Sequence, residues 1–304
     1  MSHSQTVGLF LLATLLFGTA FPAVKTGLSF IPPLLFAASR NYLSALLLLA
    51  YVGATKEYWT PRSRQDWLAV LAGGAFMIGG TGFGFVGQQF ISSGVAAVIF
   101  SFSPVVTGLL AWGLLPAERL SGRDYLAVLV GFVGVAIVVR PDPAHLVDPD
   151  VVGKLLVLLG VSVVALGTVL VRRSHSTMPI PALTGWAMLV GGSFHAGFAL
   201  VTGESMASVD LTPLAVATVV YLGVFAGALG FVSYLTLMGT VGPLKATLVT
   251  YLVPLVALGV GWWFLGERIQ PVVLVGFAVI VAGFALLESR ELIAELGKYR
   301  GAFR

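Results

Sequence analysis

The sequence of 304 residues contains no cysteine and very little charge. Without cysteine it has no disulfides, no thiolate metal ligands and no cysteine nucleophile. Charged residues make up 10% of the chain, whereas a soluble domain has roughly 25%. Hydrophobic residues make up 58%. So few charged side chains do not suffice to cover a surface in water, and we expect a membrane protein.

The sequence also lacks the residue clusters of common membrane enzymes. Its four histidines are scattered, and no H-E-x-x-H motif or intramembrane aspartate pair is present. We therefore expect no catalytic residue, no metal site and no cofactor. No carboxylate lies near the middle of an apolar segment, which argues against proton or sodium coupling through a buried Asp or Glu. The net charge of +4 is typical of cytoplasmic loops, and we expect no nucleic-acid partner.

Ten apolar segments are present, and about 20 residues suffice for a helix to cross a bilayer. They span residues 7–28, 33–52, 67–90, 94–115, 125–139, 152–171, 181–201, 214–238, 244–265 and 271–287. The fifth is short unless its helix begins within residues 121–124. No connecting loop is long enough to hold a soluble domain. The sequence therefore predicts an all-α integral membrane protein with ten transmembrane helices.

The chain repeats itself at an offset of 149 residues. Glu118 and Glu267 are separated by this distance, and each closes an apolar segment with a proline near its middle, Pro104 or Pro254. Five helices per copy is an odd number, so the second copy must be inverted, which is a hallmark of secondary transporters. We expect a first repeat over residues 7–140, a second over 151–288, and a cytoplasmic tail over 289–304.

Lysines and arginines indicate the orientation, because they accumulate in cytoplasmic loops. With the N-terminus inside, the inner loops hold Lys56, Arg62, Arg64, Arg119, Arg123, Arg172, Arg173 and Lys245. The outer side keeps Lys25, Arg140, Lys154 and Arg268. We expect a multi-pass protein of the cell membrane with both termini cytoplasmic. Its glycine-rich helix faces suit packing within one chain or in a homodimer, so both a monomer and a homodimer stay open.

Arg40 and Asn41 lie inside the second apolar segment. A charge at that depth costs at least about 2.5–3.5 kcal/mol, so such residues line a cavity or pair with a partner. We expect both to line a cavity; the alternative is that Arg40 snorkels to the outer interface. Lys25 lies nearer a helix end, and we expect it to snorkel. For His195 we expect a hydrogen-bonded structural role rather than a proton relay.

The two proline-containing segments present matched faces. Ser101 shares a face with Pro104, and Thr247 and Tyr251 share one with Pro254. A mid-helix proline frees a carbonyl group and loosens the helix. Discontinuities in matched helices of both halves point to a transport site, although a purely structural kink is also tolerated in membrane helices.

Several of these features together resemble the EamA-type transporters of the drug/metabolite transporter superfamily, over nearly the whole chain. They are residues 16–25 (LFGTAFPAVK, with Pro22), Arg40, the Pro104…Glu118-Arg119 hairpin and its repeat Pro254…Glu267-Arg268. The family often has tryptophan where Phe17 stands and a glycine where Ala117 stands. The resemblance implies a central cavity between two inverted halves, and export of amino acids, other metabolites or toxic compounds without ATP.

The sequence thus predicts a secondary transporter that exports amino acids or similar small metabolites by alternating access. Its partners would be the solute and the lipid bilayer. The residues expected to line the cavity are Arg40, Asn41, Ser101, Thr247 and Tyr251, and the expected flex points are Pro22, Pro104 and Pro254. The alternatives are an exporter of drug-like or toxic compounds, and a membrane-embedded receptor or enzyme. An enzyme would need a cluster of catalytic polar residues that the sequence lacks.

Overall fold

The computed structural model describes residues 3–115, 122–140 and 146–287, apart from the side chains of His3, Leu235, Pro243, Leu244, Lys245 and Thr247. Every regular element in these ranges is a helix. In chain order they are α1 (His3–Gly27), α2 (Pro33–Thr55), α3 (Arg64–Ala72), the π-helix η1 (Gly73–Ile78), α4 (Thr81–Gly87), α5 (Ser93–Phe100), α6 (Ser103–Leu114), α7 (Gly122–Val139), α8 (Pro149–Arg173), α9 (Ile180–Val201), the 3-10 helix η2 (Met206–Ser208), α10 (Pro213–Val220), the π-helix η3 (Tyr221–Leu229), α11 (Gly230–Val241), α12 (Pro243–Leu265) and α13 (Pro271–Leu287).

Local sequence signals fix where several helices begin. Pro33 stands in the first turn of α2, where its missing N–H group leaves no hydrogen bond unmade. The hydroxyl of Ser92 accepts a hydrogen bond from the Val95 amide at the start of α5. The Thr212 hydroxyl accepts one from the Ala215 amide at the start of α10. These are the N-cap contacts that satisfy otherwise free amide groups of a first helical turn.

Nine helical segments within the described ranges are long and apolar enough to cross a bilayer. The membrane class expected from composition is therefore confirmed. The last predicted span corresponds to α13, which has 17 described residues and falls just below this length. The fifth predicted span is longer than its apolar core, because α7 begins at Gly122.

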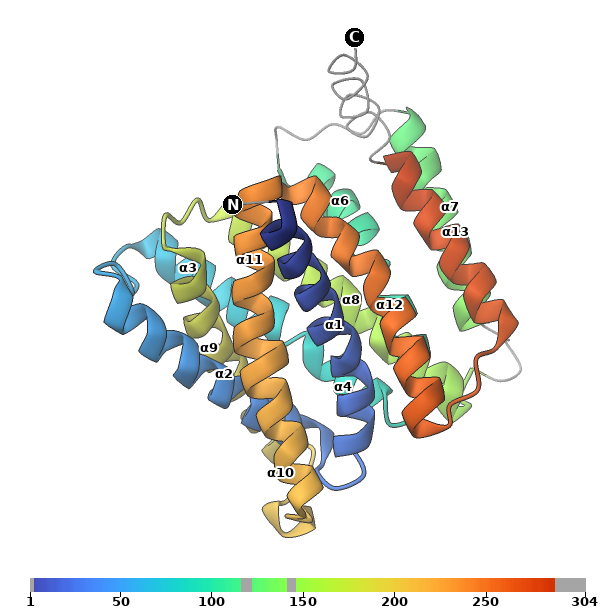
Figure 1. Ribbon diagram of the computed structural model, residues 1–304, viewed down its shortest axis with the longest axis horizontal. Helices are drawn as coiled ribbons and strands as arrows, with labels where there is room; N and C mark the ends of the chain where they lie inside the picture. Colours follow the sequence, from blue (N-terminus) through green and yellow to red (C-terminus); the bar gives the residue numbers. More distant parts are fainter. Residues whose placement is uncertain (1–2, 116–121, 141–145, 288–304) are drawn as a thin grey trace.

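Helices from the two halves of the chain lie side by side. Figure 1 shows α7 next to α13 along one edge of the bundle. Glycines allow the two backbones to approach closely: a Cβ on Gly134 would lie 2.7 Å from the Ile280 nitrogen, and one on Gly283 would lie 2.8 Å from the Gly131 nitrogen. Small residues at such contacts are typical of helix packing in lipid.

A second close contact uses a row of glycines in α8. Gly153, Gly160 and Gly167 recur at every seventh position and face the segment formed by α3, η1 and α4. A Cβ on Gly153 would lie 2.8 Å from the Gly87 carbonyl oxygen. One on Gly167 would overlap the Met77 amide nitrogen and lie 2.8 Å from the Met77 Cα atom. The glycine row of α8 therefore sets the distance between these two segments.

Three of the predicted spans are interrupted. The π-helix η1 separates α3 from α4, the π-helix η3 separates α10 from α11, and a turn at Ser101 and Phe102 separates α5 from α6. The two π-helices pack on helices of the opposite half, η1 on α9 and η3 on α2. π-Helical turns inside α-helices occur frequently at functional sites. The sequence analysis placed discontinuities at prolines and missed both π-helices.

The helices α2 and α9, with the turns that follow them, are joined at three levels. These α2–α9 links are hydrogen bonds from Leu35 N to Glu204 Oε2 (2.9 Å), between Asn41 Nδ2 and His195 Nδ1 (3.1 Å), and from Trp186 Nε1 to the Trp59 carbonyl oxygen (2.9 Å). One link lies at each end of the pair and one in the middle. The pair is therefore fixed along its length by directional contacts as well as by packing.

Candidate functional site

Arg40 lies two turns into α2 and is partly buried, on a face of the helix that points into the protein. The residues one turn before and after it on the same face, Phe36 and Ser44, are 0% and 1% exposed. The Arg40 Cζ atom lies 5.0 Å from the centroid of the Phe85 ring of α4, in cation–π geometry. The side chain therefore turns inward toward α4 and does not extend to the helix end.

The Arg40 guanidinium has no counterion in the part of the chain that the structure describes. Its Nε atom is buried there without a hydrogen-bond partner. An ion pair elsewhere in the chain joins Lys154 to Asp150, at 2.6 Å, near the start of α8. An unneutralised cation away from water is costly. A bound group with negative charge would relieve this cost.

Asn41, the next residue, belongs to a buried polar chain with His195 of α9. Both side chains are 1% exposed. The Asn41 Nδ2 atom lies 3.1 Å from His195 Nδ1, and His195 Nε2 lies 3.0 Å from the Gly79 carbonyl oxygen. A neutral imidazole satisfies both contacts, by accepting at Nδ1 and donating at Nε2; this tautomer is assigned from the partners. The hydrogen bonds expected for His195 are observed.

Ser44 connects the same face of α2 to the π-helix η3. Its Oγ atom lies 2.8 Å from the Gly223 carbonyl oxygen and 3.0 Å from that of Arg40. A Cβ on Gly227 would overlap the Ser44 hydroxyl, so glycine is required there. The irregular backbone of η3 is thus held against the face of α2 that carries Arg40.

Ser101 and Pro104 lie at the turn between α5 and α6. Ser101 is 1% exposed, and its hydroxyl donates a hydrogen bond to the Val98 carbonyl at 2.6 Å. Pro104 stands in the first turn of α6, where no amide hydrogen is needed. The interruption predicted at Pro104 therefore falls just upstream of the proline.

The counterparts in the second half lie elsewhere. Tyr251 is 7% exposed, and the centroid of its ring lies 4.3 Å from the centroid of the Phe284 ring in α13. Pro254 lies within the continuous helix α12, as Pro22 does within α1. The side chain of Thr247 lies outside the described residues. The structure thus brings Arg40 and Asn41 near α4 and α9, whereas Tyr251 packs toward α13.

Lys25 closes the end of α4. Its Nζ atom donates hydrogen bonds to the carbonyl oxygens of Gln88 (2.7 Å) and Gln89 (3.2 Å). These carbonyls are free because α4 ends at Gly87. The sequence analysis expected Lys25 to snorkel and did not foresee these two acceptors.

Glu267 binds free donor groups at the start of α5, as Lys25 binds free carbonyl groups at the end of α4. Its Oε1 atom accepts a hydrogen bond from the Ser93 amide (2.8 Å), and its Oε2 atom accepts one from the Ser93 hydroxyl (2.7 Å). A carboxylate is favoured there by the positive end of the helix dipole. The other predicted helix-end residue, Glu118, lies outside the described residues.

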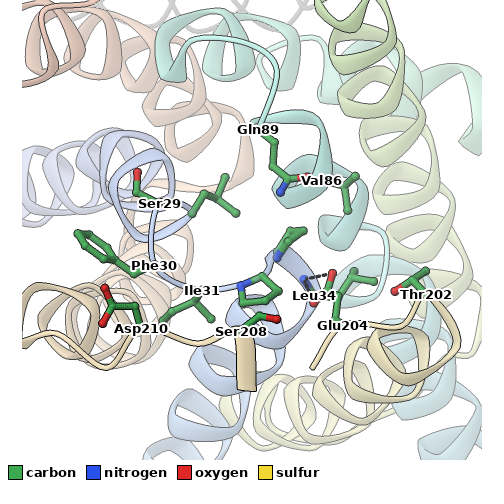
Figure 2. Close-up of a pocket in the computed structure, with 13 residues that line it drawn as sticks. Ser29, Phe30, Ile31, Leu34, Val86, Gln89, Thr202, Glu204, Ser208 and Asp210 are labelled. Atoms are coloured by element: carbon green, nitrogen blue, oxygen red, sulfur yellow. Dashed lines mark hydrogen bonds between the residues drawn. The ribbon is translucent and has the colours of Figure 1, made fainter. Parts of the chain in front are cut away.

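A cavity of about 540 Å³ opens at the start of α2, away from Arg40. Figure 2 shows its lining, with Gln89 extending toward it from the end of α4 and Glu204 beside Leu34. The Glu204 carboxylate accepts hydrogen bonds from the Leu34 and Leu35 amides. Asp210 lies on the opposite side of the cavity in this view. With two carboxylates in its lining, this cavity is unsuited to an anion.

The sequence analysis missed, or gave too little weight to, three residues that contribute contacts to the site around Arg40 and Asn41: Phe85, Gly79 and Ser44. Ser44 had a signal, since it lies four residues after Arg40 on one helix face. Phe85 and Gly79 had none, because their roles depend on how the α3–α4 segment packs on α2 and α9. No group of three or more metal-ligating side chains occurs within the described ranges.

The EamA-like transporter family matches the chain twice, over residues 5–140 and 151–289. The uncharacterized transporter YvbV of Bacillus subtilis is 26% identical over 296 residues, which cover 96% of this chain and 94% of that protein. The uncharacterized inner membrane transporter YedA of Escherichia coli K12 is 26% identical, covering 94% and 89%. A probable terminal-alkyne amino-acid exporter of Streptantibioticus cattleyicolor is 29% identical, covering 96% of each.

Structural comparison agrees at the level of the fold. A crystal structure of another protein matches with a TM-score of 0.66 at 19% sequence identity, covering 94% of this chain and 98% of that one. The family match accounts for nearly all of both halves of the chain. This protein therefore belongs to the EamA-like transporter family.

Proposed function

We propose that this protein is a secondary transporter that exports amino acids or similar small metabolites by alternating access, without ATP and without catalysing a reaction. Membership of the transporter family along both halves of the chain carries the proposal. The relative named as a probable terminal-alkyne amino-acid exporter supports the solute class. The Arg40 cation, which has no counterion among the residues that the structure describes, supports a solute site inside the helix bundle.

The architecture proposed is two inverted five-helix repeats, residues 7–140 and 151–288, followed by a cytoplasmic tail. Two separate family matches with nearly these bounds support it. The start of α1 and the end of α13 lie at the same end of the bundle, the upper end in Figure 1. With that end cytoplasmic, the turn after α12 faces outward. Both termini would then lie inside a cell membrane that the protein crosses many times.

In this scheme five residues face the solute at some stage of the cycle: Arg40, Asn41, Ser101, Thr247 and Tyr251. Pro22, Pro104 and Pro254 provide the flexibility that the cycle requires. Ser101 and Tyr251 are buried in the conformation described. They would therefore meet the solute only after the helices rearrange.

Solute flux tests the function. We expect purified protein in ATP-free liposomes to exchange at least one radiolabelled amino acid or related metabolite, at a rate well above that of protein-free liposomes. The panel should include cationic dyes and drug-like compounds as well as amino acids. Exchange of the dyes alone would favour an exporter of toxic compounds. No exchange of any member would contradict the transporter proposal.

Accessibility labelling tests the inverted topology. The cysteine-free chain allows a single cysteine to be read without background. We expect a membrane-impermeant maleimide to label Arg268→Cys on intact cells, and Arg119→Cys only after permeabilisation. The unmodified chain serves as the unlabelled control. Labelling of both positions from the same side would contradict the inversion.

A further inference from the structure

We infer that Arg40 is the anchor for a carboxylate group of the transported solute, and that the solute class is organic carboxylates with an apolar remainder, whether or not they carry an amino group. This inference rests on the proposed transport function. It concerns which chemical group the Arg40 site recognises. The cavity at the start of α2, which is lined in part by Glu204 and Asp210, is a separate feature and takes no part in the inference.

The first step is the position of the charge. Phe36 and Ser44 flank Arg40 on α2 and are buried, so this face of the helix is turned away from lipid. Phe85 covers the guanidinium at 5.0 Å. The Nε–H group is buried and has no acceptor among the described residues. The positive charge is thus fixed inside the bundle with hydrogen-bonding capacity to spare.

The second step is geometric. A guanidinium presents N–H groups in a planar fork that matches the two oxygens of a carboxylate, and such bidentate pairs are among the strongest charge-assisted hydrogen bonds. The aromatic rings of Phe36 and Phe85 pack edge to face beside it, with centroids 5.5 Å apart. An apolar solute body is compatible with such aromatic neighbours.

The third step concerns the amino group. The side chains that structure places around Arg40 are neutral or aromatic: Phe36, Ser44, Phe85 and the Asn41–His195 pair. The acidic residues that the structure describes lie in turns or within the first residues of helices. Glu204, in the turn after α9, already accepts hydrogen bonds from the Leu34 and Leu35 amides. An ammonium group therefore finds no charged partner, and the site has no means of requiring one.

The test compares matched ligands on the purified wild-type protein. The first set is 3-phenylpropionate, L-phenylalanine and 2-phenylethylamine; the second is 4-methylpentanoate, L-leucine and 3-methylbutylamine. We expect carboxylates of at least one set to raise the unfolding temperature and to exchange in proteoliposomes, with or without the amino group. The matching amine should do neither. Because this comparison uses only the wild type, it does not depend on whether a variant folds.

Variants then assign the effect to Arg40. We expect Arg40→Gln to weaken carboxylate binding at least tenfold, and Arg40→Lys to weaken it less, because lysine keeps the charge but not the fork. Arg64→Gln, at an exposed arginine at the start of α3, serves as the charge-matched control and should bind as the wild type does. Exchange of the amines but not of the carboxylates, or unchanged carboxylate binding in folded Arg40→Gln, overturns the inference while transport stands. Exchange of another member of the broad panel but of none of these compounds also overturns the inference while transport stands. Exchange of no compound in either panel overturns the transport function itself.

Discussion

Gly167→Ala is expected to destabilise the protein by about 1–3 kcal/mol, the range typical of overpacked interiors. The added methyl group would overlap the Met77 amide nitrogen and lie 2.8 Å from its Cα atom. Because these are backbone atoms of η1, no side-chain rotation can make room. Either α8 or the α3–α4 segment must move, which also strains the contacts of Gly153 and Gly160. Unfolding in mixed detergent micelles, followed by circular dichroism, measures the change.

The control for this prediction is Gly197→Ala in α9, where an added Cβ would meet nothing within 4 Å. Alanine is the better helix former, so this change should be neutral or stabilise by up to about 1 kcal/mol. The two variants carry the same chemical change in two helices and differ in what surrounds it. Equal effects on the unfolding free energy would show that the glycine row of α8 does not set the helix spacing.

The link between Asn41 and His195 gives the second prediction. Asn41→Leu or His195→Leu alone leaves the other buried polar group without its partner, and we expect each to lose about 1–3 kcal/mol of stability. The double variant should lose less than the two losses added together, because no orphaned partner remains. The measured coupling should be about 0.6 kcal/mol and at most about 1.7 kcal/mol, the range found for hydrogen bonds between membrane helices.

Ser193→Ala provides the matched control for this cycle. Ser193 also lies on α9 and receives a hydrogen bond from α2, from the Tyr42 hydroxyl, but that contact is exposed and 3.3 Å long. We expect little loss of stability. Strict additivity of the Asn41 and His195 single variants would mean that their contact contributes nothing to holding the two helices together.

Composition and length sufficed to predict the membrane-spanning class and nearly all of the helical segments. The interruptions were not predictable, because a π-helix differs from an α-helix only in that each hydrogen bond reaches one residue further along the chain. The π-helix is stabilised by groups from other helices. At η3 the stabilising group is the Ser44 hydroxyl, which reaches the Gly223 carbonyl from another helix. The residues near Gly223 in the sequence do not indicate that Ser44 is its partner.

The candidate site was also predictable from the sequence only in part. The high cost of a charge within lipid singles out Arg40 from sequence alone. The Phe85 ring above it is visible only once α2 and α4 are packed. The acceptors of Lys25 were missed for a related reason: these carbonyls are free only because α4 stops at Gly87. Residues whose role depends on a neighbouring helix end are beyond single-segment reasoning.

The α2–α9 links have a mechanical consequence. Because hydrogen bonds join α2 and α9 near both ends and in the middle, the two helices can tilt together but cannot slide along each other or separate. They therefore move as one rigid unit. Relative displacement must then come from segments whose backbone is already discontinuous, such as the joint between α5 and α6. In an alternating cycle, Arg40 would move with this rigid unit, and the solute site would change where α5 and α6 shift relative to it.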